Sequence, residues 1–151
     1  MAATTPKLSV TPGQIYRHTK WYQDSDGTWK SKYLLVLAKT RSGDIIFRLL
    51  TSQQNARPTA PACFHGDPYP GFYLGVLGGP LIKQSWLELC RRQDFDDLDF
   101  CTFIGSGVIC LITTLAAPLL CNALECAAAA DDTTNEQTRR MLDQRALLGC
   151  C

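Results

Sequence analysis

The side chains best suited to binding chemistry are aromatic and basic residues that lie close together in the first third of the chain. Trp21, Tyr22 and Trp29 stand near several lysines. Aromatic faces stack on unpaired bases while lysines neutralise the neighbouring phosphates, so a single-stranded nucleic acid is one ligand that this pattern allows. Aromatic residues on a small sheet also form core or dimer contacts, and the pattern alone leaves both roles open.

The distribution of charge points to the same half of the chain. The 151 residues carry a net charge of +1, which by itself predicts no attraction to nucleic acid. Residues 1–50, however, hold eight basic and three acidic side chains, whereas residues 51–151 hold seven basic and eleven acidic ones. The first half is therefore the expected contact for a polyanion, with solvated strand faces as the alternative.

Familiar catalytic and metal-binding motifs are missing from the sequence. It contains no G-x-S-x-G elbow, P-loop, G-x-G-x-x-G or H-E-x-x-H motif, so we expect no cofactor. The eight cysteines include no C-x-x-C, and neither histidine has a second histidine at ligand spacing, which predicts no metal site. No apolar secretory segment opens the sequence, so we expect a cytoplasmic protein with reduced thiols. Asp94, Asp96, Asp97 and Asp99 are expected to form a solvated acidic strand edge.

Short strands must position the aromatic and basic residues. We expect a disordered lead-in over residues 1–11 and a single domain over residues 12–151. The apolar run 33–38 predicts a strand buried on both faces, and residues 45–50 are its hairpin partner across a turn at 41–44. A proline-rich connection over residues 55–71 precedes a strand at 71–76, and residues 81–90 fit a short strand or one helical turn. These spacings predict a small antiparallel β-barrel over residues 12–110 within an α+β fold.

The C-terminal third predicts a helical arm over about residues 112–148. Residues 100–124 contain no charged side chain, and about 20 apolar residues suffice to cross a membrane. Pro118 and the segment Gly105-Ser106-Gly107 interrupt this run, so we expect a last strand near 102–110 and a buried helix from about 113, with no membrane contact. Asp131 to Thr134 predict the capped start of a second, amphipathic helix that packs on the barrel or on another subunit.

An ordered set of motifs runs through residues 12–100. Pro12-Gly13-Gln14-Ile15-Tyr16 opens it, Lys30-Ser31-Lys32 precedes the apolar strand, Thr51-Ser52-Gln53 ends the partner strand, and Ser85-Trp86-Leu87 follows later. This order resembles the MazF/PemK family of toxin endoribonucleases. Chains of that family open with a Pro/Arg-Gly-Asp-Ile/Val strand, place Arg-Pro before an apolar strand, and end the next strand in Thr-Thr or Thr-Ser.

The resemblance implies an SH3-like barrel, a homodimer, an antitoxin protein as partner, and cleavage of single-stranded RNA without a metal. It places Lys32, or alternatively Lys30, at the scissile phosphate as the basic residue, and Thr51 with its neighbour Ser52 as the hydroxyl. In such a reaction the ribose 2′-OH attacks the adjacent phosphorus, and a cation and a hydroxyl donate to the charged oxygens. The side chains expected to contact RNA are Lys20, Trp21, Trp29, Lys30 and Arg48.

Proton transfer from the 2′-OH also needs a base, for which His18 and His65 are the two candidates. Two departures from the family pattern bear on activity. The family's Arg-Pro is Lys32-Tyr33 here, and its acidic residue in the opening strand is Gln14. Lysine lacks the planar fork with which arginine binds two phosphate oxygens at once. Both departures favour the alternative of a non-catalytic SH3-like module, either a degenerate toxin relative or a phage or plasmid regulator, that binds a protein partner.

Overall fold

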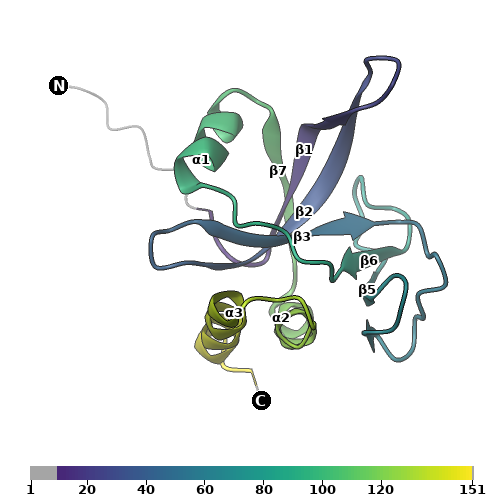
Figure 1. Ribbon diagram of the computed structural model, residues 1–151, viewed down its shortest axis with the longest axis vertical. Coiled ribbons are helices and arrows are strands. Elements are labelled where there is room, and N and C mark those ends of the chain that lie inside the picture. Colours follow the sequence, from purple (N-terminus) through teal and green to yellow (C-terminus); the bar gives the residue numbers. More distant parts are fainter. Residues whose placement is uncertain (1–9, 151) are drawn as a thin grey trace.

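A seven-stranded antiparallel sheet with three helices forms the fold in the computed structural model, which describes residues 10–150 (Figure 1). The predicted lead-in lies largely outside the described residues. The strands lie in the order β4-β5-β6-β3-β2-β1-β7. Their bounds are Gln14–Gln23 (β1), Trp29–Lys39 (β2), Ile45–Thr51 (β3), Cys63–Phe64 (β4), Gly71–Gly75 (β5), Ser85–Glu88 (β6) and Ile109–Thr114 (β7). The predicted α+β class is confirmed, but the described sheet is open, with β4 and β7 at its two edges, and does not close into a barrel.

Strand β2 lies near the middle of the sheet and is buried on both faces, as its unbroken apolar sequence predicted. Leu35 and Leu37 belong to one hydrophobic cluster, together with residues of the two C-terminal helices. Leu34 and Val36 belong to a second cluster, which includes Phe100 from the first helix. Figure 1 shows α2 and α3 together beneath the sheet, whereas α1 lies beside β7 on the opposite side. The alternating side chains of β2 therefore hold the two layers of helices to the sheet.

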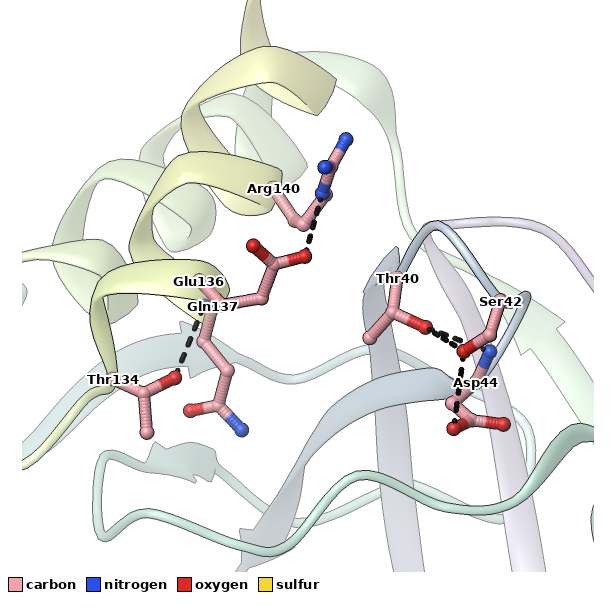
Figure 2. Close-up of polar contacts among 7 residues, drawn as sticks. All are labelled: Thr40, Ser42, Asp44, Thr134, Glu136, Gln137 and Arg140. Carbon is pink, nitrogen blue, oxygen red and sulfur yellow. Dashed lines mark hydrogen bonds and ion pairs between the residues drawn. The ribbon is translucent and has the colours of Figure 1, made fainter.

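The predicted hairpin between β2 and β3 is confirmed, and a polar turn closes it (Figure 2). The Thr40 and Ser42 hydroxyls lie 2.9 Å apart, and the Asp44 backbone N–H donates to Thr40 Oγ1 over 3.1 Å. Gly43 adopts a φ of 93°, which side chains with a Cβ rarely tolerate. These contacts fix the length of the turn and, with it, the register of the two strands.

Helix α1 (Asp97–Gly105) replaces two predicted features, the acidic strand edge and the strand near residues 102–110. Asp96 caps the helix by accepting a bond from the Asp99 N–H over 3.0 Å. Asp97 and Asp99 lie in the first turn, where the helix dipole favours negative charge. The aspartates thus start a helix, and the last strand, β7, comes several residues later than expected.

Helices α2 (Ala117–Ala128) and α3 (Asn135–Leu147) form the predicted C-terminal arm. Helix α2 starts at residue 117 rather than near 113 because β7 extends to Thr114 and Pro118 stands in the first turn. Thr134 caps α3 by accepting a bond from the Gln137 N–H over 3.1 Å, as predicted (Figure 2). None of the helices in residues 10–150 is long and apolar enough to cross a membrane.

Two disulfide bonds join parts of the chain that are distant in sequence. Cys63 of β4 is bonded to Cys126 of α2, and Cys121 of α2 is bonded to Cys150. The expectation that all the cysteines are reduced is therefore wrong for these four. Sequence spacing did not reveal the pairs because their members lie 63 and 29 residues apart and meet only through the packing of α2.

Arg48 of β3 is completely buried between the sheet and α3. Its guanidinium donates to the Phe47 carbonyl over 2.8 Å and to Gln137 Oε1 over 3.0 Å. The Gln137 amide in turn donates to Asp94 Oδ1 over 2.7 Å, and Figure 2 shows that this side chain points away from α3. Burial lowers the pKa of Arg48, although the negative charges of Asp132 and Asp94 oppose this effect. The network joins β3, α3 and the segment before α1.

Removing this guanidinium should destabilise the protein. We expect Arg48→Ala to lower the free energy of unfolding by about 2–5 kcal/mol, because it leaves a cavity and orphans two buried acceptors. Urea unfolding measures the change. Lys20→Ala, at an exposed position of β1, is the matched control and should stay within about 0.5 kcal/mol of wild type. An unchanged unfolding free energy in Arg48→Ala would show that the buried network contributes nothing to the fold.

Candidate functional site

A cleft of about 710 Å³ opens where β2 begins and β3 ends. Its walls come from the start of β2, the end of β3 and the segment that leads into β6. The volume is in the range typical of ligand sites. Its lining combines lysines, hydroxyls and apolar side chains: Tyr22, Lys30, Ser31, Lys32, Tyr33, Leu50, Thr51, Ser52, Gln53, Pro80, Leu81, Ile82, Lys83 and Ser85.

The register of β2 and β3 brings Lys32 and Thr51 together in this cleft. Tyr33 and Leu50 form the last pair of this ladder, and Lys32 and Thr51 are the next residues on the two strands. Both side chains line the cleft. The structure thus unites the three residues predicted to be catalytic, because Ser52 lines the same cleft.

The hydroxyl of Thr51 has a proton to offer a ligand. The Gln53 backbone N–H donates to Thr51 Oγ1 over 3.1 Å, which fixes the oxygen at the end of β3. Among residues 10–150, no acceptor takes the proton of this hydroxyl. Thr51 therefore both terminates the strand and presents a donor to the cleft.

Three lysines give the cleft its charge, and no carboxylate is among its lining residues. Lys30 is paired with Asp24 at 3.4 Å, and Lys32 is paired with Glu88 at 3.8 Å. The two carboxylates are not among the lining residues. Lys83 is exposed and has no ion pair within the part of the chain that the structure describes. An anion entering the cleft would meet the unpaired ammonium of Lys83. It would compete with Asp24 and Glu88 for the ammonium groups of Lys30 and Lys32.

Glu88, which holds Lys32, is itself positioned by a buried arginine that sequence analysis did not single out. Arg57 is only 3% exposed; its Nη2 lies 4.0 Å from Glu88 Oε1, and its Nη1 donates to the Gln53 carbonyl over 2.9 Å. A Cβ at Gly71 would lie 2.7 Å from Arg57 Cδ, so the glycine makes room for this side chain. The only sequence signal is a glycine at the start of a strand, which does not identify its neighbour.

The other residues predicted to contact RNA divide into three groups. Lys30 lines the cleft, whereas Lys20 and Trp29 are exposed but outside its lining. Trp21 packs against Phe47 and belongs to the hydrophobic cluster on the α1 side of the sheet. Arg48 is completely buried, so the prediction that its side chain contacts RNA is wrong for this fold. Tyr22 of β1 pairs with Lys30 of β2. Of Trp21, Tyr22 and Trp29, it is the one that lines the cleft.

Neither histidine lines the cleft. His18 is buried against Trp21 and Phe103, with ring centroids 5.4 and 5.7 Å apart. Burial lowers the pKa of His18, and the Lys20 N–H donates to its Nδ1 over 3.2 Å. His65 lies beside the Cys63–Cys126 bond, with its Nε2 3.2 Å from Cys63 Sγ. The two candidates for a general base are thus engaged elsewhere in the fold.

Cys63, His65 and Cys126 form a group of potential metal ligands that sequence analysis missed. Their ligand atoms all lie within 4.8 Å of one another. The pair Cys63-x-His65 was the available signal, because alternate residues of an extended segment point the same way. The third member comes from α2, 61 residues beyond His65.

Comparisons with protein-family models, with curated proteins and with solved structures find no match to this chain.

The burial of His18 predicts a dependence of stability on pH. The unfolded chain binds a proton at the ordinary histidine pKa of 6.5, whereas the folded chain resists protonation. The stability due to neutral His18 is therefore fully present above that pH and is lost as the pH falls below it. We expect the urea midpoint to decrease between neutral pH and about pH 5, and less so in His18→Phe.

His65→Gln, at an exposed position, is the control and should keep the full pH dependence of the wild type. An equal loss of stability in wild type and His18→Phe would show that other groups cause it.

Proposed function

We propose that the cleft binds single-stranded RNA and that the chain cleaves it without a metal, as a toxin-type endoribonuclease of the MazF/PemK kind. The observation that carries this proposal is the meeting of Lys32 and Thr51 in one cleft. The family resemblance had assigned these two residues to the scissile phosphate. They come from two different strands, β2 and β3.

The composition of the cleft fits a nucleic-acid strand. Lys30, Lys32 and Lys83 can each contact a phosphate. Tyr22 lies opposite Lys30, so one base could stack on the ring while its phosphate meets the ammonium. The hydroxyls of Thr51 and Ser52 and the amide of Gln53 add donors for sugar or phosphate oxygens. Both halves of the ligand, base and backbone, thus find partners.

Cleavage would use the same two central side chains. Attack of the ribose 2′-OH on phosphorus places extra negative charge on the phosphate oxygens. The ammonium of Lys32 and the hydroxyl of Thr51 would donate to those oxygens. Glu88 would act as a positioning residue, because it holds Lys32 at 3.8 Å and is itself held by Arg57. A base for the 2′-OH proton is not among the lining residues, which include neither histidine nor carboxylate.

That composition of the lining favours a second candidate function, the non-catalytic module already considered from the sequence. Such a module would use the cleft, or the surface around it, to bind a partner without breaking a bond. The homodimer, the antitoxin partner and the cytoplasmic location are parts of the toxin proposal, and a result that overturns it removes the reason for them. An assay that separates binding from cleavage distinguishes the two functions.

Incubation of purified protein with total cellular RNA in excess EDTA tests cleavage. We expect discrete fragments with the wild type and a roughly 10²–10³-fold lower rate with Lys32→Ala or Thr51→Val, because each removes a donor to the transition state. Lys39→Ala, at the far end of β2 and outside the cleft, is the matched control and should cleave normally.

Fluorescence anisotropy with a labelled single strand tests binding in the same samples. We expect Lys83→Ala to weaken binding and to reduce the slope of log K against log salt by about 0.7, the loss of one phosphate contact. Binding without cleavage by the folded wild type would contradict the enzyme and support the non-catalytic module. A folded wild type that neither binds nor cleaves RNA would overturn the RNA proposal altogether.

A further inference from the structure

The group formed by Cys63, His65 and Cys126 lies outside the cleft and has no part in the proposed reaction. Cys63 is in the two-residue strand β4, His65 follows directly after it, and Cys126 lies in α2. The histidine is exposed, Cys63 is half-buried and Cys126 is 2% exposed. Solvent therefore reaches the group from the histidine side, while the sheet and α2 enclose the other side.

The distances in the group match those of a zinc site with one exception. His65 Nε2 lies 3.2 Å from Cys63 Sγ and 3.9 Å from Cys126 Sγ. Tetrahedral coordination with Zn–S near 2.3 Å and Zn–N near 2.05 Å separates nitrogen from sulfur by about 3.5 Å and sulfur from sulfur by about 3.8 Å. The nitrogen already stands at ligand distance from both sulfurs. Only the sulfur–sulfur separation, that of a covalent bond, is too short.

Opening the bond would need a small movement that the fold permits. The sulfurs must separate by about 1.7 Å, from a bond length of about 2.05 Å. Within residues 10–150, strand β4 is at the edge of the sheet and pairs only with β5, so backbone pairing holds Cys63 from one side. Cys126 of α2 is part of the main hydrophobic cluster, so the smaller movement is expected on its side.

The second disulfide provides an internal comparison. Cys121 and Cys150 are also bonded, but among residues 10–150 no third ligand of the histidine, cysteine or carboxylate kind completes a cluster with them. Structural cross-linking alone requires no imidazole beside the sulfurs. The position of His65 is thus the feature that distinguishes the Cys63–Cys126 bond.

We propose that Cys63, His65 and Cys126 form a redox-controlled zinc site. A dithiol reductant transfers two electrons and two protons to the Cys63–Cys126 bond, giving two thiols, and becomes a cyclic disulfide itself. A zinc ion then binds both sulfurs as thiolates, with release of the two protons, and binds neutral His65 through Nε2. Water takes the fourth position on the exposed side. A disulfide oxidant takes two electrons from the thiolates and two protons from water, and becomes two thiols; the Cys63–Cys126 bond forms again and the zinc ion is released.

Zinc binding by the full chain tests the site. The protein is reduced with a phosphine, which takes oxygen from water as it becomes a phosphine oxide, loaded with zinc chloride and freed of excess metal. A chromogenic chelator then measures the zinc retained. We expect about one zinc ion per reduced chain and none per oxidised chain. Cobalt in place of zinc should give a thiolate-to-metal charge-transfer band.

His65→Gln is the decisive variant because it leaves both cysteines in place. It should bind zinc at least about tenfold more weakly than wild type, yet form the Cys63–Cys126 bond normally on oxidation. The double variant Cys121→Ser, Cys150→Ser is the matched control and should retain zinc with wild-type affinity. Absence of zinc from the reduced wild type, or equal affinity in His65→Gln, would overturn the proposal and leave a purely structural disulfide.

Discussion

Strand β2 is buried on both faces, and this burial fixes where the helices and the neighbouring strands can pack. Its alternating side chains enter two separate hydrophobic clusters, one beneath α2 and α3 and the other beneath α1. A strand with two apolar faces has no polar face to fix its register, because a slip of one residue would exchange one apolar face for another. The closed turn at residues 40–44 and the irregularity between Val36 and Ala38 supply that register instead. The cleft depends on this register, because it brings the start of β2 and the end of β3, with Lys32 and Thr51, to the same place.

Two buried arginines connect the sheet to its surroundings in different ways. Arg48 bonds to a glutamine of α3 and so joins the helical layer to β3. Arg57 donates to the carbonyl of Gln53, a lining residue of the cleft, and contacts Glu88, the partner of Lys32. A buried guanidinium needs partners for its donors, and each arginine therefore orders the segments that supply them. The charge that remains accessible at the cleft is that of lysines, whose flexible stems reach solvent.

The sequence was informative where local physics decides the structure. The β2–β3 hairpin, its turn and the Thr134 cap follow from apolar runs and from residues that bond to their own backbone. Where tertiary packing decides, the sequence misled: Arg48 is internal and four cysteines are paired. The aspartates near residue 97 start a helix through a local cap, a role that their pattern also allowed. Residue type alone cannot tell a buried arginine of a strand from an exposed one. Lys32, Thr51 and Ser52 share a cleft as expected, whereas Lys83, Arg57 and Glu88 come from segments with no motif.

Lysine footprinting tests most directly whether the cleft is where RNA binds. The protein is acetylated with and without a single-stranded RNA, and mass spectrometry gives the modification rate of each lysine. We expect RNA to protect Lys30, Lys32 and Lys83 and to leave the rates of Lys20 and Lys39 unchanged. Uniform rates with and without RNA, or protection confined to lysines outside the cleft, would contradict it.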